Sequence, residues 1–216
     1  MRKQNGFVVW LLLLPILIIV ILATLFVFSN KNKQETSNAP DNPPLTSLTV
    51  PYIKISDLSG VGPYSTNQET AGYIHNGLNF MANTDLVEYR SISAGLVKEA
   101  RVFYDNTRTD THPQVNLQVL YNKNTTVVYT FEPYSKDVAD AERQLTLINV
   151  KEGDTITAGQ SLGKLIKTAP QSHVHIHIMK DNKEICFADM FTDQEQLEML
   201  GIVEVAPNKQ AKLCYE

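Results

Sequence analysis

The chain has 216 residues, enough for one domain with a buried core after an apolar N-terminal segment is set aside. It carries 19 Lys and Arg against 23 Asp and Glu, a formal net charge of -4. This acidic balance argues against a nucleic-acid partner and against simple electrostatic adhesion to an anionic membrane or wall polymer.

Residues 7–28 form an apolar segment without any charge. Its length is sufficient to cross a hydrocarbon core of about 30 Å, which predicts a transmembrane helix. Arg2 and Lys3 precede it and place residues 1–6 in the cytoplasm, although two lysines soon after it weaken this argument. A cleaved signal peptide is the alternative, but its apolar region would be shorter and no A-x-A site follows. We expect an uncleaved signal anchor, and therefore a single-pass membrane protein whose C-terminal domain is extracytoplasmic.

Residues 29–47 are polar, contain three prolines and show no apolar periodicity. They are predicted to be a flexible linker. The folded domain is expected over residues 48–216. Its first strand is expected in the segment LTVPYIKI, residues 48–55, with the proline at a sheet edge.

Alternating, β-branched and aromatic residues then predict a series of strands. These strands are expected at residues 86–93, 95–104, 115–121 and 125–132. The loop at residues 105–113 contains His112, which we expect to be a solvated loop histidine.

The C-terminal half mixes short helices with tight turns. Residues 134–144 are polar and compatible with one or two helical turns, which Ser135 and Asp137 could start. The glycines in residues 150–163 predict short strands joined by turns. Residues 192–200 begin with a capping-box pattern and are followed by glycine, which predicts a short helix.

The strand expected at residues 173–178 has the sequence HVHIHI. Strict alternation places His173, His175 and His177 on one face, about 7 Å apart, and the aliphatic residues on the other. Such a row of nitrogens is suited to binding a metal ion or a substrate. The alternative is the wet face of an ordinary antiparallel strand.

A second pair of polar residues stands near position 77. His75 and Asn79 lie four residues apart around Gly77, and they could meet at a site if the glycine bends the chain. By itself this spacing is more typical of two solvated residues beside a turn.

Three motifs in the same order resemble the lysostaphin-type (LytM-like) zinc metalloendopeptidases over about residues 70–190. They are H-x-G-hydrophobic-N-F at 75–80, the glycine-rich run at 150–163 and H-x-H at 173–175. The resemblance implies a mostly β fold: an antiparallel sheet or barrel-like duplicated hybrid motif with one or two short helices.

The resemblance also implies a zinc site. His75, Asn79 and His175 match the positions of the family's metal ligands, and His173 matches a catalytic histidine. Zinc with three protein ligands and an open position is suited to amide hydrolysis, because it lowers the pKa of water and polarises a carbonyl.

The candidate site departs from the family pattern. Asn79 stands where the family has an aspartate, and Phe131 stands where a Y-x-H strand would supply a second catalytic histidine. Strand alternation is expected to turn the neighbouring Glu132 to the opposite face. His177 falls where the family commonly has glutamate, and it could be a substitute ligand or simply fill space.

These departures leave several functions open. The first is a metallopeptidase-like domain with weakened or lost catalysis that acts on, or binds, cell-wall peptidoglycan or an envelope protein. The second is an active zinc endopeptidase that hydrolyses peptidoglycan cross-bridge amides with a modified ligand set. A structural or carrier-like β module is a minor alternative, since Lys164 and Lys167 do not stand in the tight hairpin that a lipoyl or biotinyl carrier needs.

The only cysteines are Cys186 and Cys214. Outside the cytoplasm they can form a disulfide, which would tie the C-terminal tail to the domain. Two unpaired thiols are the alternative.

Overall fold

The computed structural model describes residues 39–68, 74–104, 112–205 and 207–216. The predicted N-terminal cytoplasmic segment and membrane helix lie outside these residues. Residues 40–216 form one compact unit. Among the described residues, no helix is long and apolar enough to span a membrane.

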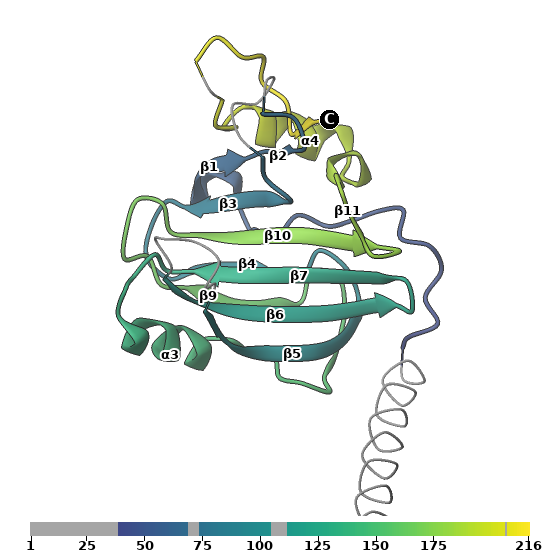
Figure 1. The fold of residues 1–216 in the computed structure, drawn as a ribbon, viewed down its shortest axis with the longest axis vertical. Helices are drawn as coiled ribbons and strands as arrows, with labels where there is room; N and C mark the ends of the chain where they lie inside the picture. The colour runs from purple at the N-terminus through teal and green to yellow at the C-terminus, as the bar shows by residue number, and fades with distance from the viewer. Residues whose placement is uncertain (1–38, 69–73, 105–111, 206) are drawn as a thin grey trace, which may run out of the picture. The chain divides into compact units, whose positions relative to one another are not determined.

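One antiparallel sheet of eight strands dominates this unit and curls into a half-barrel (Figure 1). The strand order is β1-β3-β10-β7-β6-β5-β8, and β11 pairs with β10. The strands are β1 (Leu58–Gly62), β3 (Leu78–Ala82), β5 (Gly95–Tyr104), β6 (Pro113–Asn122), β7 (Thr125–Glu132), β8 (Thr155–Ile156), β10 (His173–Lys180) and β11 (Lys183–Ile185).

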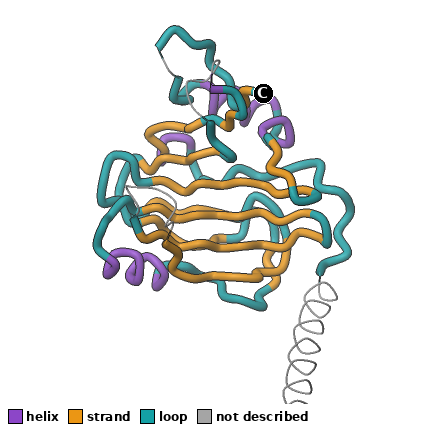
Figure 2. Tube along the Cα trace, in the orientation of Figure 1, coloured by secondary structure: helices purple, strands orange, loops and turns teal. Residues whose placement is uncertain are grey.

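Smaller elements complete the unit (Figure 2). In two small sheets, β4 pairs antiparallel with β9 and β2 pairs parallel with β12. These strands are β2 (Tyr64–Ser65), β4 (Val87–Arg90), β9 (Ser161–Leu165) and β12 (Cys214–Tyr215). The helices are α3 (Val138–Thr146) and α4 (Asp193–Leu200), with 3-10 turns at Ile55–Asp57 and Ala188–Met190. The prediction of a mostly β domain with short helices is confirmed.

The two faces of the large sheet differ because side chains alternate along each strand. On the inner face, Tyr129 and Phe131 of β7 and Ile176 of β10 are fully buried in the core. The opposite face carries histidines from β10, threonines from β7 and amides from β3 and β6. This polar face holds the candidate site.

Local sequence signals set the ends of both helices. Asp137 caps α3, and its side chain accepts a hydrogen bond from the N–H of Ala139. Thr192 and Glu195 form a reciprocal capping box at the start of α4. Both helix starts agree with the sequence predictions.

The predicted strand at residues 48–55 is wrong. The N–H of Leu48 donates to the carbonyl of Met190, and the N–H of Thr49 donates to the carbonyl of Ile92, so the segment bonds to separate partners instead of one strand. The first strand begins later, at Leu58. The folded unit nevertheless starts before residue 48, because Leu45 is buried in the core.

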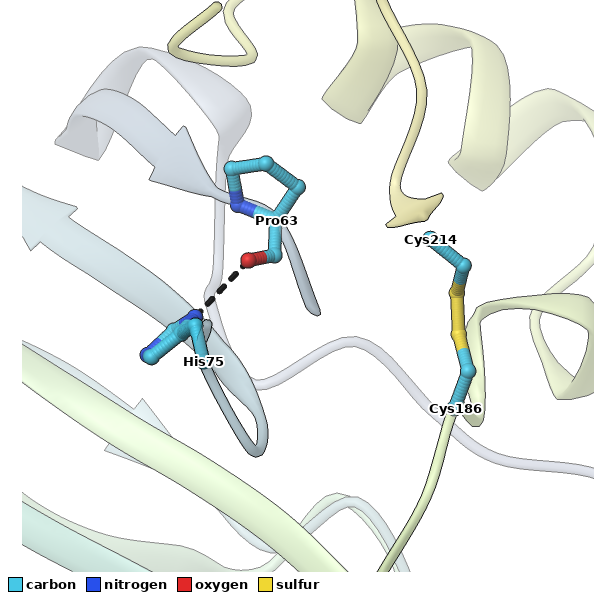
Figure 3. Close-up of a disulfide and its surroundings, with 4 residues drawn as sticks. All are labelled: Pro63, His75, Cys186 and Cys214. Carbon is cyan, nitrogen blue, oxygen red and sulfur yellow. Dashed lines mark hydrogen bonds between the residues drawn. A yellow bond between two sulfur atoms is a disulfide. The ribbon is translucent and has the colours of Figure 1, made fainter. Parts of the chain in front are cut away.

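A disulfide joins Cys186, just after β11, to Cys214 in β12 (Figure 3). Their Cα atoms are 6.1 Å apart. Since β12 pairs with β2, the bridge holds the C-terminal strand beside the segment that leads to His75.

Candidate functional site

Strand register brings the predicted site residues together on the polar face of the large sheet. On β10, His173, His175 and His177 alternate along one side, and His175 is paired in register with Asn79 of the neighbouring β3. His75 precedes β3 and forms an isolated bridge with Ser65. His75 and His175 thereby come into contact, although they are 100 positions apart in sequence.

Three side-chain atoms converge at one point. The Nδ1 atom of His175 lies 2.8 Å from the Oδ1 atom of Asn79 and 3.1 Å from the Nε2 atom of His75. That Nε2 atom is also 3.1 Å from the Oδ1 atom of Asn79. We call His75, Asn79 and His175 the donor trio.

The backbone orients His75 within this trio (Figure 3). Its Nδ1–H donates to the carbonyl of Pro63 over 2.7 Å, which leaves the Nε2 lone pair directed at the other two residues. Such a hydrogen bond on the distal nitrogen is the usual way in which a protein fixes the tautomer of a metal-binding histidine.

Burial favours the neutral form of the two imidazoles of the trio. It lowers the pKa of His75, although the hydrogen bond to Pro63 opposes the effect. Burial also lowers the pKa of His175 well below its usual value, and the neighbouring His75 adds to this shift. Neutral imidazole nitrogens are the form that binds metal ions.

The geometry of the trio fits one face of a zinc coordination sphere. Zinc bonds of about 2.0 Å in a tetrahedron place neighbouring donor atoms about 3.3 Å apart, close to the separations of the trio. The third donor is an amide oxygen, which carries no charge. Among the described residues, no group of three or more His, Cys, Asp or Glu side chains is arranged to hold a metal ion.

A second cluster adjoins the trio on β7. The carboxylate of Glu132 lies 3.4 Å from the Nε2 atom of His173 and 3.0 Å from the Nε2 atom of His112. The side-chain amide of Gln114 donates to it over 3.4 Å. Burial would raise the pKa of Glu132, but the hydrogen bonds to His112 and His173 hold it well below its usual value.

Two sequence predictions are corrected here. Glu132 lies on the site face, in register with His173, whereas Phe131 is buried in the core. The prediction of which β7 side chains face the site is therefore wrong. It followed the Y-x-H motif, whereas the packing of the core decides the orientation of the strand. His112 is not a solvated loop residue, since its side chain is only 11% exposed.

His177 lies on the same face but outside the donor trio. Its ring centroid is 5.4 Å from that of His175. Its buried Nδ1 atom has no hydrogen-bond partner among the described residues. Burial lowers its pKa, and the charge of Glu184 opposes the shift. Its role as a substitute ligand stays a prediction.

Two cavities lie over these clusters. The first, of about 340 Å³, is lined by the donor trio, Glu132 and His173 among others. The second, of about 440 Å³, shares Asn116, Val128 and His177 with the first. The shared lining makes them neighbours along the polar face of β6, β7 and β10.

Comparison with known proteins gives matches among solved structures only. No protein-family model matches the chain, and no curated protein matches it. A candidate M23 peptidase from Pseudomonas aeruginosa is 18% identical with a TM-score of 0.45, over 76% of this chain and 60% of that one. A zinc-containing peptidase from Vibrio cholerae is 18% identical with a TM-score of 0.38, over 68% of this chain and 37% of that one.

The catalytic domain of lysostaphin from Staphylococcus simulans is also similar. It is 23% identical with a TM-score of 0.36, and the match covers 59% of this chain and 84% of that domain. The structural matches are thus to M23 and lysostaphin-type peptidase domains, at low sequence identity. The chain spans less than two thirds of the P. aeruginosa and V. cholerae proteins.

Proposed function

We propose that the domain is a lysostaphin-type metallopeptidase-like domain that binds zinc through the donor trio and has weakened catalysis. Its substrate or ligand is the peptide part of cell-wall peptidoglycan, met outside the membrane to which residues 7–28 anchor the chain. The observation that carries the proposal is the convergence of His75, Asn79 and His175 within 3.1 Å of one another.

Each residue has a distinct task in this proposal. His75 and His175 supply neutral nitrogens, and Asn79 supplies an oxygen. Zinc held there would supply a Lewis acid for amide hydrolysis. His173 lies beside the trio and is placed to exchange a proton with a substrate in the first cavity.

Weakened catalysis is proposed because of Asn79. An aspartate would bring a negative charge to the trio, whereas the amide brings only a dipole, and carboxylates bind metal ions more strongly than amides do. The expected consequence is looser zinc binding and a lower fraction of active protein at a given zinc concentration.

The active zinc endopeptidase remains the second candidate, and one observation favours it. The site face of β7 carries Glu132 and not an inert aromatic residue, so a second group able to hold a proton or a charge lies beside His173. In this alternative the modified set hydrolyses peptidoglycan cross-bridge amides at an ordinary rate.

A zinc titration of the full chain in detergent tests the proposal. We expect one zinc equivalent in the wild type, its loss in His175→Ala, and binding tighter by roughly tenfold or more in Asn79→Asp because a charge is added to the trio. Hydrolysis of cross-bridge peptides should rise with zinc occupancy in Asn79→Asp.

The matched control is Asn116→Asp, which adds the same charge to the same cavity away from the trio. Equal tightening in both variants would show a general charge effect and contradict the assignment of Asn79 as a ligand. A wild-type rate equal to that of Asn79→Asp at saturating zinc would favour the second candidate.

A further inference from the structure

The strand β7 contributes a buried carboxylate that the sequence motifs did not include. Glu132 is held between two histidines from different parts of the chain, His112 before β6 and His173 at the start of β10. The exposed fractions of the three side chains are 13%, 11% and 7%. A carboxylate this well enclosed keeps its position, because each of its oxygens has a partner.

The ring of His173 is held at both nitrogens. Its Nδ1 atom is 2.7 Å from the carbonyl of Gln171, and its Nε2 atom is 3.4 Å from the Oε1 atom of Glu132. The first contact fixes one edge of the ring, but it leaves rotation about that hydrogen bond possible. The second contact removes this freedom.

We propose that Glu132 is a positioning residue for His173, and that His112 and Gln114 hold the carboxylate in place. This inference rests on the proposed function, because it says which residue orients His173, the histidine that the proposed function places beside the donor trio. A carboxylate that orients a histidine is a recurrent arrangement around metal-binding histidines, where removal of the carboxylate lowers activity or metal affinity by roughly 10–100-fold. We expect an effect of the same order on the activity that depends on His173.

The packing around the cluster agrees with a fixed geometry. The ring of Tyr134 packs against His112 in a tilted arrangement with ring centroids 4.2 Å apart, and its centroid is 5.7 Å from that of His173. The other oxygen of the carboxylate, Oε2, accepts from His112 and Gln114. His173 therefore depends on contacts that differ from those of the donor trio, and the two clusters can be tested separately.

The first experiment compares wild type, Glu132→Gln and His112→Gln for zinc binding and for hydrolysis of cross-bridge peptides. Glu132→Gln keeps the shape of the side chain and removes its charge. We expect unchanged zinc affinity, unchanged KM, and a kcat lower by roughly 10–100-fold, with a smaller loss in His112→Gln. An unchanged kcat in Glu132→Gln would overturn the proposal.

The second experiment does not depend on activity. Imidazole N–H protons that are buried and hydrogen-bonded exchange slowly with water, so a proton NMR signal from the Nε2–H of His173, the group that faces Glu132, should be observed in the wild type. It should disappear in Glu132→Ala and persist in Asn79→Ala, which disturbs only the donor trio. Persistence in Glu132→Ala would overturn the proposal.

The two experiments separate the inference from the function on which it rests. Absence of zinc binding and hydrolysis in the wild type would contradict the proposed function, and the NMR signal would still decide whether Glu132 holds His173. Three results together would support both the proposed function and the role of Glu132. They are an active wild type, a reduced kcat in Glu132→Gln and loss of the NMR signal in Glu132→Ala.

Discussion

At the scale of single residues, Gly77 determines whether the donor trio can form. A Cβ atom at this position would lie 2.2 Å from the carbonyl oxygen of Ile176 and 2.8 Å from the Cε1 atom of His175. The backbone of β10 therefore passes where a side chain would stand. The close approach brings His75 and Asn79 within reach of His175.

Gly77→Ala tests this requirement. Because the added methyl group meets backbone and not a flexible side chain, we expect a loss of about 1–3 kcal/mol in the free energy of unfolding, measured by urea denaturation. Zinc affinity should fall as well, because β10 must move away from β3.

The matched control is Gly60→Ala in β1. There the nearest atoms belong to the side chain of Glu204, which can move aside. Equal effects of the two substitutions would contradict the special role of Gly77.

Tyr129 explains why Glu132 and not Phe131 faces the site. Its hydroxyl is buried, lies 3.1 Å from the hydroxyl of Ser91 and accepts a hydrogen bond from the N–H of Ile92 over 2.9 Å. Burial raises the pKa of Tyr129 to about 12, so the hydroxyl keeps its proton. These bonds fix Tyr129 in the core, and alternation then turns Glu132 outward.

At the scale of elements, one side chain of α3 attaches the helix to the end of β9. Gln144 is fully buried; its amide donates to the carbonyl of Lys164 and accepts from the N–H of Ile166, each over 2.8 Å. The carbonyl of Lys164 and the N–H of Ile166 therefore have these hydrogen bonds only while α3 lies against the end of β9.

Gln144→Ala should leave a buried carbonyl and a buried N–H without partners. We expect a loss of about 2–4 kcal/mol in the free energy of unfolding, since each unsatisfied group costs about 1–3 kcal/mol. Urea denaturation followed by circular dichroism measures it. Glu142→Ala, on the exposed side of the same helix, is the control and should be close to neutral. A small loss in Gln144→Ala would mean that water replaces the lost bonds.

At the scale of the whole domain, the disulfide closes a loop of 28 residues between Cys186 and Cys214. It connects the end of the large sheet to the C-terminal strand, which pairs beside the segment that carries His75. The disulfide thus contributes both to the stability of the domain and to the position of the site.

Removal of this link by the double substitution Cys186→Ser and Cys214→Ser should cost about 3.5 kcal/mol in the chain-entropy model. The midpoint of thermal unfolding should fall by roughly 10 °C for a domain of this size. Reduction of the wild type should produce the same shift. An unchanged midpoint in the double variant would show that the tail is held by its packing alone.

Sequence periodicity by itself determined the main strands, the caps of α3 and α4, and the row of histidines on one face of β10. These features depend on neighbours a few residues apart, so local patterns suffice to predict them. The spacing of His75 and Asn79 did not suffice in this way, and only the resemblance to the lysostaphin-type motifs indicated a common site for them.

Only the tertiary structure decided which partners meet across the sheet. The register of β3 against β10 converts two separate motifs into one donor trio, and the packing of Tyr129 decides that Glu132 lies beside His173. His112 reaches the cluster because the strand that follows it, β6, pairs with β7. These contacts span long sequence separations and depend on which side chains fill the core, so no local pattern in the sequence predicts them.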